Sequence, residues 1–189
     1  NAAYTVASSL DGAIAALFQA FSQVVGASTT NLADSEIRQA IAYLEAANVP
    51  GIYDGEVAFF MHPNTFWKQV QDIDKFSLAV NSPVNDPTAK KPRASLYGIP
   101  VYVSADIGSS TLSTATGGRV NALAHKDAIH WATLPLGVAS KSNGYTGEYG
   151  VRIQSNYMPD YLSTLSTADI CYGVIENRDT SGVWLRTTT

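Results

Sequence analysis

Charged side chains are scarce in this sequence of 189 residues. They make up 15% of the chain, against roughly 25% in an average domain. The net charge is −4, and the densest basic run is formed by Lys90, Lys91 and Arg93. Binding a nucleic-acid backbone directly requires a dense basic face. The sequence therefore argues against a protein that grips DNA or RNA, although it leaves room for a container that encloses nucleic acid.

Small polar residues (Ser, Thr, Asn and Gly) supply much of the remaining polarity. A surface short of charge suits extensive subunit contacts, because the cores of protein interfaces are depleted in Lys, Glu and Asp. A secreted or simply low-charge domain has the same composition. Composition alone leaves both interpretations open.

Cysteine and long apolar runs are also nearly absent. The single cysteine, Cys171, lies in the apolar segment ADICYGVIE and is predicted to be a buried structural thiol, with a reactive thiol as the alternative. No apolar run approaches the roughly 20 residues that span a bilayer, so no membrane partner and no signal peptide are expected. Because the first residue is Asn1, we expect a processed, truncated or partly represented chain.

Catalytic signatures are missing as well. The sequence has no Gly-x-Ser-x-Gly elbow, no phosphate-binding loop and no Gly-x-Gly-x-x-Gly. His125 and His130 are five residues apart and lack the i, i+4 spacing of a helical zinc pair, although Asp127 between them permits a His/Asp site in principle. His62 precedes Pro63 and is expected to cap a helix. We therefore predict no enzyme, no metal and no cofactor, since the acids are scattered: Asp72, Asp74, Asp127, Asp160 and Asp169.

The order of predicted elements is mixed α+β. Apolar residues at helical spacing predict a long helix from Leu10 to Val25 and a second helix that begins near Asn31 and ends before Pro50. A buried strand, Glu56 to Met61, leads through His62 into a third helix. Phe59, Phe60 and Trp67 are expected in the core. Residues 81–95 and 108–118 are predicted to be loops. Later strands are expected at 96–104 and 149–157, and two further strands within 170–186 are expected to form a closing hairpin.

Four segments, in this order, resemble the major capsid proteins of tailed phages, the Hong Kong ninety-seven fold. The helix from Leu10 to Val25 resembles that family's spine helix. AIAYLEAANVPGIYDGEVAFFMHPNTFWKQV looks like its helix, Asn-Val-Pro turn, apolar strand and helix start. LYGIPVYVSADI resembles its Gly-x-Pro-Val strand, and ADICYGVIENRDTSGVWLR is similar to its closing strand and hairpin. The N-terminal arm and E-loop of the family have no counterpart in this sequence, so cross-linking chemistry is not carried over.

The resemblance implies an α+β fold in three parts. Residues 1–30 would be the spine helix of a peripheral domain, 31–165 an axial domain, and 166–189 the closing strands of the peripheral domain. The expected function is that of a structural subunit of an icosahedral capsid, a virion component assembled in the host cytoplasm. Its partners would be further copies of itself in pentamers and hexamers, then scaffold, portal or decoration proteins, with DNA enclosed and not recognised by sequence.

The only candidate site residues are Lys90, Lys91 and Arg93, as a subunit interface pairing with acids such as Asp72 or Asp74 of a neighbouring copy. A solvated loop is the simpler interpretation of this trio. Two other functions stay open: the shell of an encapsulin-like compartment with a protein cargo, and a monomeric α+β enzyme or binding domain. The last predicts a well-formed pocket with titratable residues.

Overall fold

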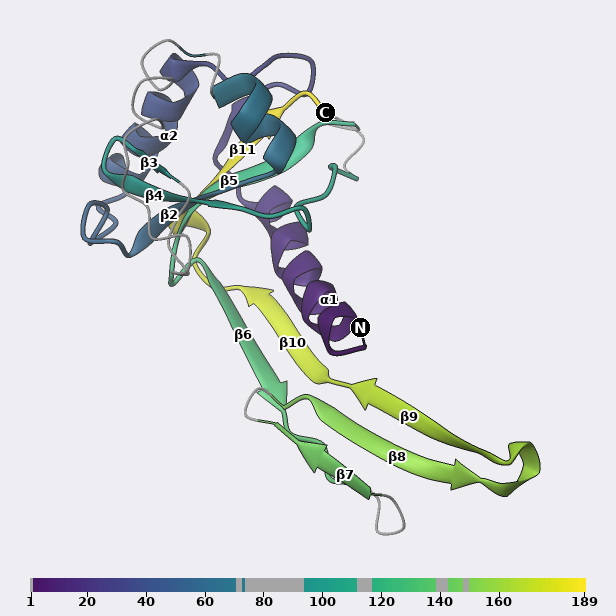
Figure 1. Cartoon of the computed structure of the whole chain (residues 1–189). Coiled ribbons are helices and arrows are strands. Elements are labelled where there is room, and N and C mark those ends of the chain that lie inside the picture. Colours follow the sequence, from purple (N-terminus) through teal and green to yellow (C-terminus); the bar gives the residue numbers. More distant parts are fainter. Residues whose placement is uncertain (1, 71–72, 74–93, 112–116, 139–142, 148–149) are drawn as a thin grey trace. The chain divides into compact units, whose positions relative to one another are not determined.

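The structure, a computed structural model, describes residues 2–70, 73, 94–111, 117–138, 143–147 and 150–189. The chain forms two compact units (Figure 1). We call residues 15–129 and 176–189 the core unit, and residues 1–14 and 130–175 the hairpin unit. The mixed α+β class predicted from the sequence is confirmed.

The core unit is built on a six-stranded sheet, in the order β1-β11-β5-β2-β4-β3. The β1–β11 and β2–β4 pairs are parallel, and the other three pairs are antiparallel. The strands are β1 (Val24–Gly26), β2 (Val57–Met61), β3 (Ala94–Leu96), β4 (Ile99–Val103), β5 (Arg119–His125) and β11 (Gly182–Thr187).

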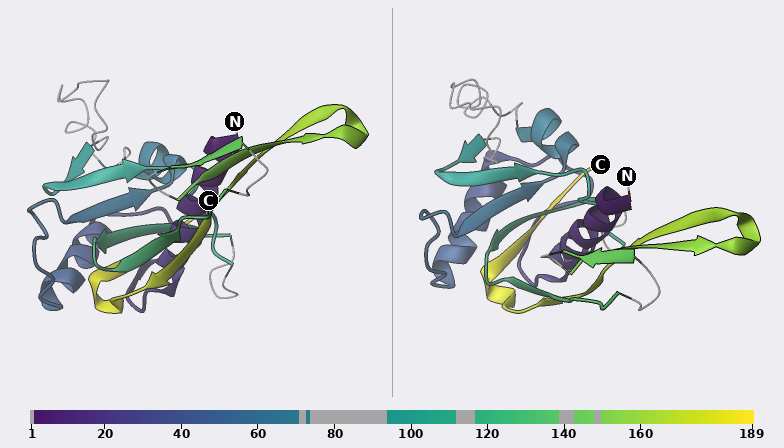
Figure 2. Two further views of the ribbon diagram at one scale, coloured as in Figure 1. Left: turned by 90° about the horizontal axis from the view of Figure 1, so that it is seen from below. Right: turned by 60° about the horizontal axis from the view of Figure 1, so that its bottom comes forward.

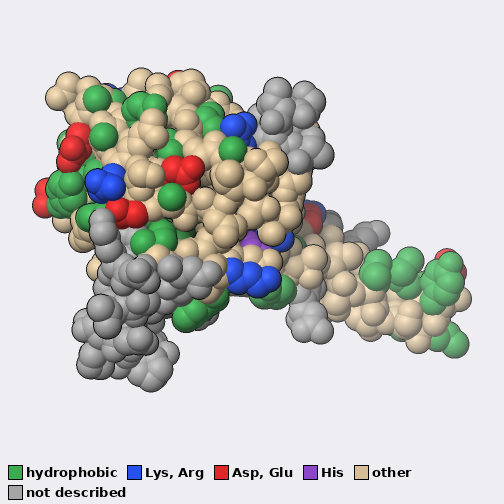
Figure 3. All heavy atoms as spheres, turned by 90° about the horizontal axis from the view of Figure 1, so that it is seen from above, with side chains coloured by type: hydrophobic (Ala, Val, Ile, Leu, Met, Phe, Trp, Pro, Cys, Tyr) green, Lys and Arg blue, Asp and Glu red, His purple; other side chains and the backbone are tan. Residues whose placement is uncertain are grey.

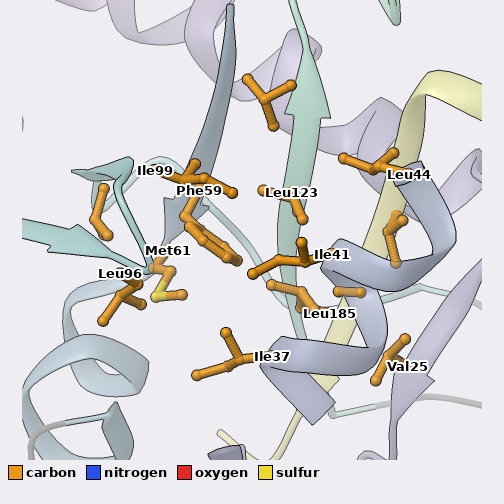
Figure 4. Close-up of a cluster of buried hydrophobic side chains, with 14 of the residues drawn as sticks. Val25, Ile37, Ile41, Leu44, Phe59, Met61, Leu96, Ile99, Leu123 and Leu185 are labelled. Carbon is orange, nitrogen blue, oxygen red and sulfur yellow. The ribbon is translucent and has the colours of Figure 1, made fainter. Parts of the chain in front are cut away.

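Helix α2 (Asp34–Ala46) packs its apolar side against this sheet. The predicted stripe of Ile37, Ile41 and Leu44 is buried, as the spacing required. Its first turn carries the two acids that favour the positive end of a helix dipole, and Glu36 Oε2 accepts a hydrogen bond from the Ala33 amide at 2.9 Å. Figure 4 shows the stripe facing side chains of the sheet, among them Phe59, Leu123 and Leu185.

The other face of the sheet is also buried, which explains why β5 is apolar on both sides. A second cluster of buried hydrophobic side chains covers this face and includes Phe18, Phe21 and Trp184. The predicted helix from Leu10 to Val25 is wrong in its second half. Helix α1 (Ala2–Ala16) gives way to the 3₁₀ turn Leu17–Ala20, and Val24–Gly26 join the sheet as β1. Pairing with β11 and burial of the two phenylalanines outweigh the helical spacing.

The third helix is of a different type over its described part. The residues after His62 form a π-helical segment, Thr65–Val70. Phe59 is fully buried and Phe60 partly buried. Trp67 is 52% exposed, so its expected place in the core is wrong. It packs edge-on against Phe66, which takes the inward position.

The hairpin unit holds a three-stranded antiparallel sheet in the order β7-β8-β9 and the two-stranded pair β6–β10 (Figures 1 and 2). The first fourteen residues, most of α1, belong to the same unit. Of the helices in the described residues, none is long and apolar enough to span a membrane. The strands are β6 (Ile129–Leu134), β7 (Asn143–Thr146), β8 (Arg152–Met158), β9 (Ser163–Asp169) and β10 (Cys171–Glu176).

The predicted closing hairpin is wrong. β10 pairs with β6, whereas β11 lies between β1 and β5 in the core unit. The segment between them is held elsewhere: the amides of Asn177 and Arg178 both donate to the Ala128 carbonyl, and the Ser22 amide donates to Asp179 Oδ1. The 3₁₀ turn Asp179–Ser181 then leads into an extended Gly182 instead of reversing the chain.

The two compact units do not coincide with the predicted ranges 1–30, 31–165 and 166–189. Those ranges describe domains of the capsid family, and that division stays a prediction.

Candidate assembly surface

The sheet of the hairpin unit exposes apolar side chains to solvent. Alternation places Tyr145, Ile153 and Tyr157 on one face, because Tyr145 pairs with Ile153 in the β7–β8 register and Tyr157 lies four residues further along β8. All three are exposed. Leu165 on β9 is exposed on the opposite face. Scattered exposed apolar residues are ordinary, but a group on one small sheet marks a surface suited to interaction.

The turn between β8 and β9 is also apolar. It is a short 3₁₀ turn, Pro159–Tyr161, followed by Leu162 with φ +47°. Leu162 is 83% exposed and Tyr161 75%. On the face drawn in Figure 3, hydrophobic side chains gather at the end of this hairpin with no Lys or Arg beside them. Leu162 therefore adopts a backbone conformation that is unfavourable for a bulky residue, and it buries little apolar surface within its own unit.

One ion pair fixes the register of β8 and β9. Arg152 donates from Nε to Asp169 Oδ1 at 3.0 Å and makes a second contact from Nη2 to Oδ2, while its Nη1 donates to the Gly137 carbonyl at 2.8 Å. The hydrogen bonds from Arg152 lower the pKa of Asp169. On the other face Ser155 and Ser166 lie 3.0 Å apart, hydroxyl to hydroxyl. The only acid on β9 is therefore already paired.

A polar cluster lies where β5 ends in the core unit. The buried ring of His125 has Nε2 at 3.4 Å from Glu56 Oε2, and its Nδ1 accepts the Asp127 amide at 3.1 Å. Lys126 pairs with Glu56, and the hydrogen bonds from Lys126 and then His125 lower the pKa of that carboxyl. His130 is exposed on β6. In the part of the chain that the structure describes, no group of three or more His, Cys, Asp or Glu is arranged to hold a metal ion.

A second polar group in the core unit is fully buried. Asn121 Oδ1 accepts the His62 amide at 2.8 Å, and its Nδ2 donates to Thr187 Oγ1 at 3.2 Å. The amide of Asn64 donates to His62 Nδ1 at 3.1 Å, so the capping role predicted for His62 is confirmed. Asn121 and Glu56 were not predicted from the sequence. Asn121 could have been identified from the sequence, because it is a polar residue within an otherwise apolar strand.

Scans of protein-family models and of curated protein sequences give no match. Solved structures do match. One from Mycobacterium phage Che8 has a TM-score of 0.63 at 16% identity, over 97% of this chain and 60% of that chain. The capsid of cyanophage P-SCSP1u gives 0.62 at 13% identity, over 98% and 63%. The mature capsid of bacteriophage PhiM1 gives 0.60 at 16% identity, over 99% and 63%. The chain has the phage capsid fold.

The capsid fold accounts for nearly every residue of this chain, but the chain spans only 60–63% of the length of those three matched structures. An encapsulin structure also matches. The SrpI encapsulin complex of Synechococcus elongatus matches with a TM-score of 0.56 at 12% identity, over 86% of this chain and 52% of that chain.

The candidate interface residues Lys90, Lys91 and Arg93 lie outside the described residues, as do Asp72 and Asp74. Their pairing across subunits of a capsid fold stays a prediction.

Cys171 is exposed, so its predicted burial is wrong. Burial alternates along β10, with Tyr172 and Val174 turned inward and Cys171 outward. The Tyr172 hydroxyl donates to the Ser9 carbonyl of α1 at 3.3 Å, in agreement with its inward position. The apolar run around Cys171 was correctly predicted to be a strand, but Cys171 itself lies on its outward face.

Proposed function

We propose that this protein is a structural subunit of an icosahedral phage capsid, assembling into pentamers and hexamers that enclose a DNA genome. The observation that carries the proposal is the match to phage capsid structures over 97–99% of the chain. The charge-poor, apolar sheet of the hairpin unit supports it, because such a surface is suited to burial against another subunit.

We assign the two compact units to the two domains of that fold. The core unit would be the axial domain, and the hairpin unit with α1 as spine helix would be the peripheral domain. This assignment moves the proposed boundaries from 30/31 and 165/166 to 14/15, 129/130 and 175/176. It is supported by the Tyr172–Ser9 contact, which ties α1 to β10 within the hairpin unit.

Assembly would depend on the shape of the contacts between subunits and would require no chemical reaction. Heterologous contacts close into rings of five and six, and the rings tile a shell. Each contact can be weak, because many act together in every subunit. The net charge of −4 is compatible with a capsid shell that encloses DNA without sequence-specific recognition. The virion is the proposed location, with assembly in the host cytoplasm and scaffold, portal or decoration proteins as further partners.

The basic trio offers a direct test of one proposed contact. If Lys90, Lys91 and Arg93 pair with acids of a neighbouring subunit, replacing all three with Ser lowers the yield of closed particles, measured by electron microscopy at matched protein concentration. A second triple variant, with the exposed Arg38, Lys68 and Arg178 replaced by Ser, controls for the loss of three positive charges. Normal yield from the triple variant would assign the trio to a solvated loop.

A compartment with a protein cargo is the second candidate, favoured by the encapsulin match. Its lower TM-score and coverage place it behind the phage capsid. The protein should be produced from its complete natural gene and its particles purified from the native source. Nuclease-protected DNA inside the particles supports the capsid, whereas a single enriched cargo protein without DNA supports the compartment.

A further inference from the structure

Strand β9 is the longest edge strand of the three- and six-stranded sheets, apart from the two-stranded pair β6–β10, whose strands have six residues each. It is seven residues long, whereas the edge strands β1 and β3 of the six-stranded sheet have three residues each and β7 has four. Short edge strands limit unwanted pairing with other chains. The sheet order leaves β9 bonded to β8 on one side only, with an unbroken register from 163–158 to 169–152. Figures 1 and 2 show it as the outer strand of its sheet.

The usual protections of an edge are missing from β9. Its sequence, STLSTAD, contains no Lys, Arg or Pro, and the continuous register leaves no bulge. Its one charge, on Asp169, is held by Arg152. Residues 163–167 are all exposed. Alternate residues of an antiparallel edge direct their N–H and C=O groups outward, so β9 presents a template for another strand.

We propose that β9 pairs antiparallel with β9 of a second copy of this chain across a two-fold axis. The inference rests on the proposed shell function, which supplies the second copy; an isologous contact of this kind falls on a two-fold axis of the assembly. A two-fold axis perpendicular to two antiparallel strands passes between one residue and its own copy. Overlap of the whole strand places that axis at Ser166.

The side chains of β9 are compatible with this register. Thr164 faces Ala168 of the second copy, Leu165 faces Thr167, and Ser163 faces Asp169, so no like charges meet. The two copies of Leu165 become diagonal neighbours on one face, within reach of each other. A parallel, in-register pairing would instead set Asp169 beside its own copy, which is unfavourable. Two sheets β7-β8-β9 would join into one of six strands.

Engineered cysteines test the register directly. Cys171→Ser first removes the only native thiol. In that background Ser166→Cys places two thiols on residues opposite each other, with Cα atoms about 4.5–5.5 Å apart, which suits a disulfide. Thr164→Cys is the matched control, because it is exposed on the same face of the same strand. Its own copy would be about 14 Å away, four residues along the ladder.

Each variant is purified in the same way, inspected for closed particles by negative-stain microscopy, treated with a mild oxidant and run on a non-reducing gel. The proposal predicts disulfide-linked dimers from Ser166→Cys at more than about tenfold the level from Thr164→Cys, because only the former meets the geometry of a disulfide. Closed particles with no such dimer, or with equal dimer from both variants, overturn the pairing and leave the shell intact. Dimer without particles would keep the pairing and contradict the shell. The absence of both dimer and particles would contradict the pairing and the shell together.

Discussion

Single polar residues hold the junctions of the core unit. The buried Asn121 joins three parts of the chain, because it accepts the amide of His62 and donates to Thr187 in β11. His62 in turn orders the start of the π-helical segment through the Asn64 amide. Both contacts use neutral groups, and a neutral acceptor on a histidine is available only while that nitrogen is unprotonated.

This arrangement makes the stability of the subunit depend on His62. Burial, and then the charge of Arg119, lower the pKa of His62. A lowered pKa in the folded state means that the unfolded chain binds the proton more readily, so stability is fully present above the ordinary value near 6.5 and falls as the pH drops through the lowered one.

We expect His62→Asn to weaken this pH dependence, because an Asn side chain can accept the same amide without titrating. The measurement is chemical unfolding of the dissociated subunit at pH 7.5 and pH 5.5. The wild type should lose more stability than the variant between the two values, and His130→Asn, at an exposed histidine, should behave as the wild type. Parallel losses in wild type and His62→Asn would contradict the account.

At the scale of elements, the packing of β11 over the 3₁₀ turn explains where the helix prediction failed. A methyl group on Gly182 would collide with the ring of Phe21, which is only 2% exposed and has no room to move. The glycine therefore allows the chain after α1 to pass beneath β11. Periodicity within residues 10–25 carries no information about this contact, because the contacting residue lies at the far end of the chain.

Gly182→Ala should accordingly destabilise the subunit by about 1–3 kcal/mol, the usual cost of overpacking a rigid core. Gly173→Ala is the matched control within a strand: nothing lies near the added methyl group, so a change within about 0.5 kcal/mol is expected. Urea unfolding at neutral pH measures both. Equal stability of the two variants would show that Phe21 yields to the methyl group.

The elements that sequence could predict are those specified by their own residues. The stripe of α2, the buried strand β2 and the capping at His62 follow from local spacing. The sheet order and the separation of β10 from β11 depend on contacts between distant segments, such as Ala128 with Asn177. The exposed apolar face formed by Tyr145, Ile153 and Tyr157 was not predicted. An alternating pattern shows that these residues share one face of a sheet, but it does not show whether that face is buried or exposed.

At the scale of the whole molecule, the proposed function requires many copies to close into a shell. Two features support this function. The capsid fold covers nearly the entire chain, and the sheet of the hairpin unit has exposed apolar side chains and a long edge strand that is paired on one side only. An isolated subunit with such a sheet would leave that surface in water. The proposed shell would bury this surface in every copy.

The native mass of the protein, produced from its complete natural gene, tests this claim most directly. Multi-angle light scattering gives the mass and negative-stain microscopy gives the form of the same sample. The account predicts closed spherical particles in the megadalton range, expected of a shell built from many ~20 kDa subunits. A homogeneous monomer at micromolar concentration, with no particles in the source material, would contradict it.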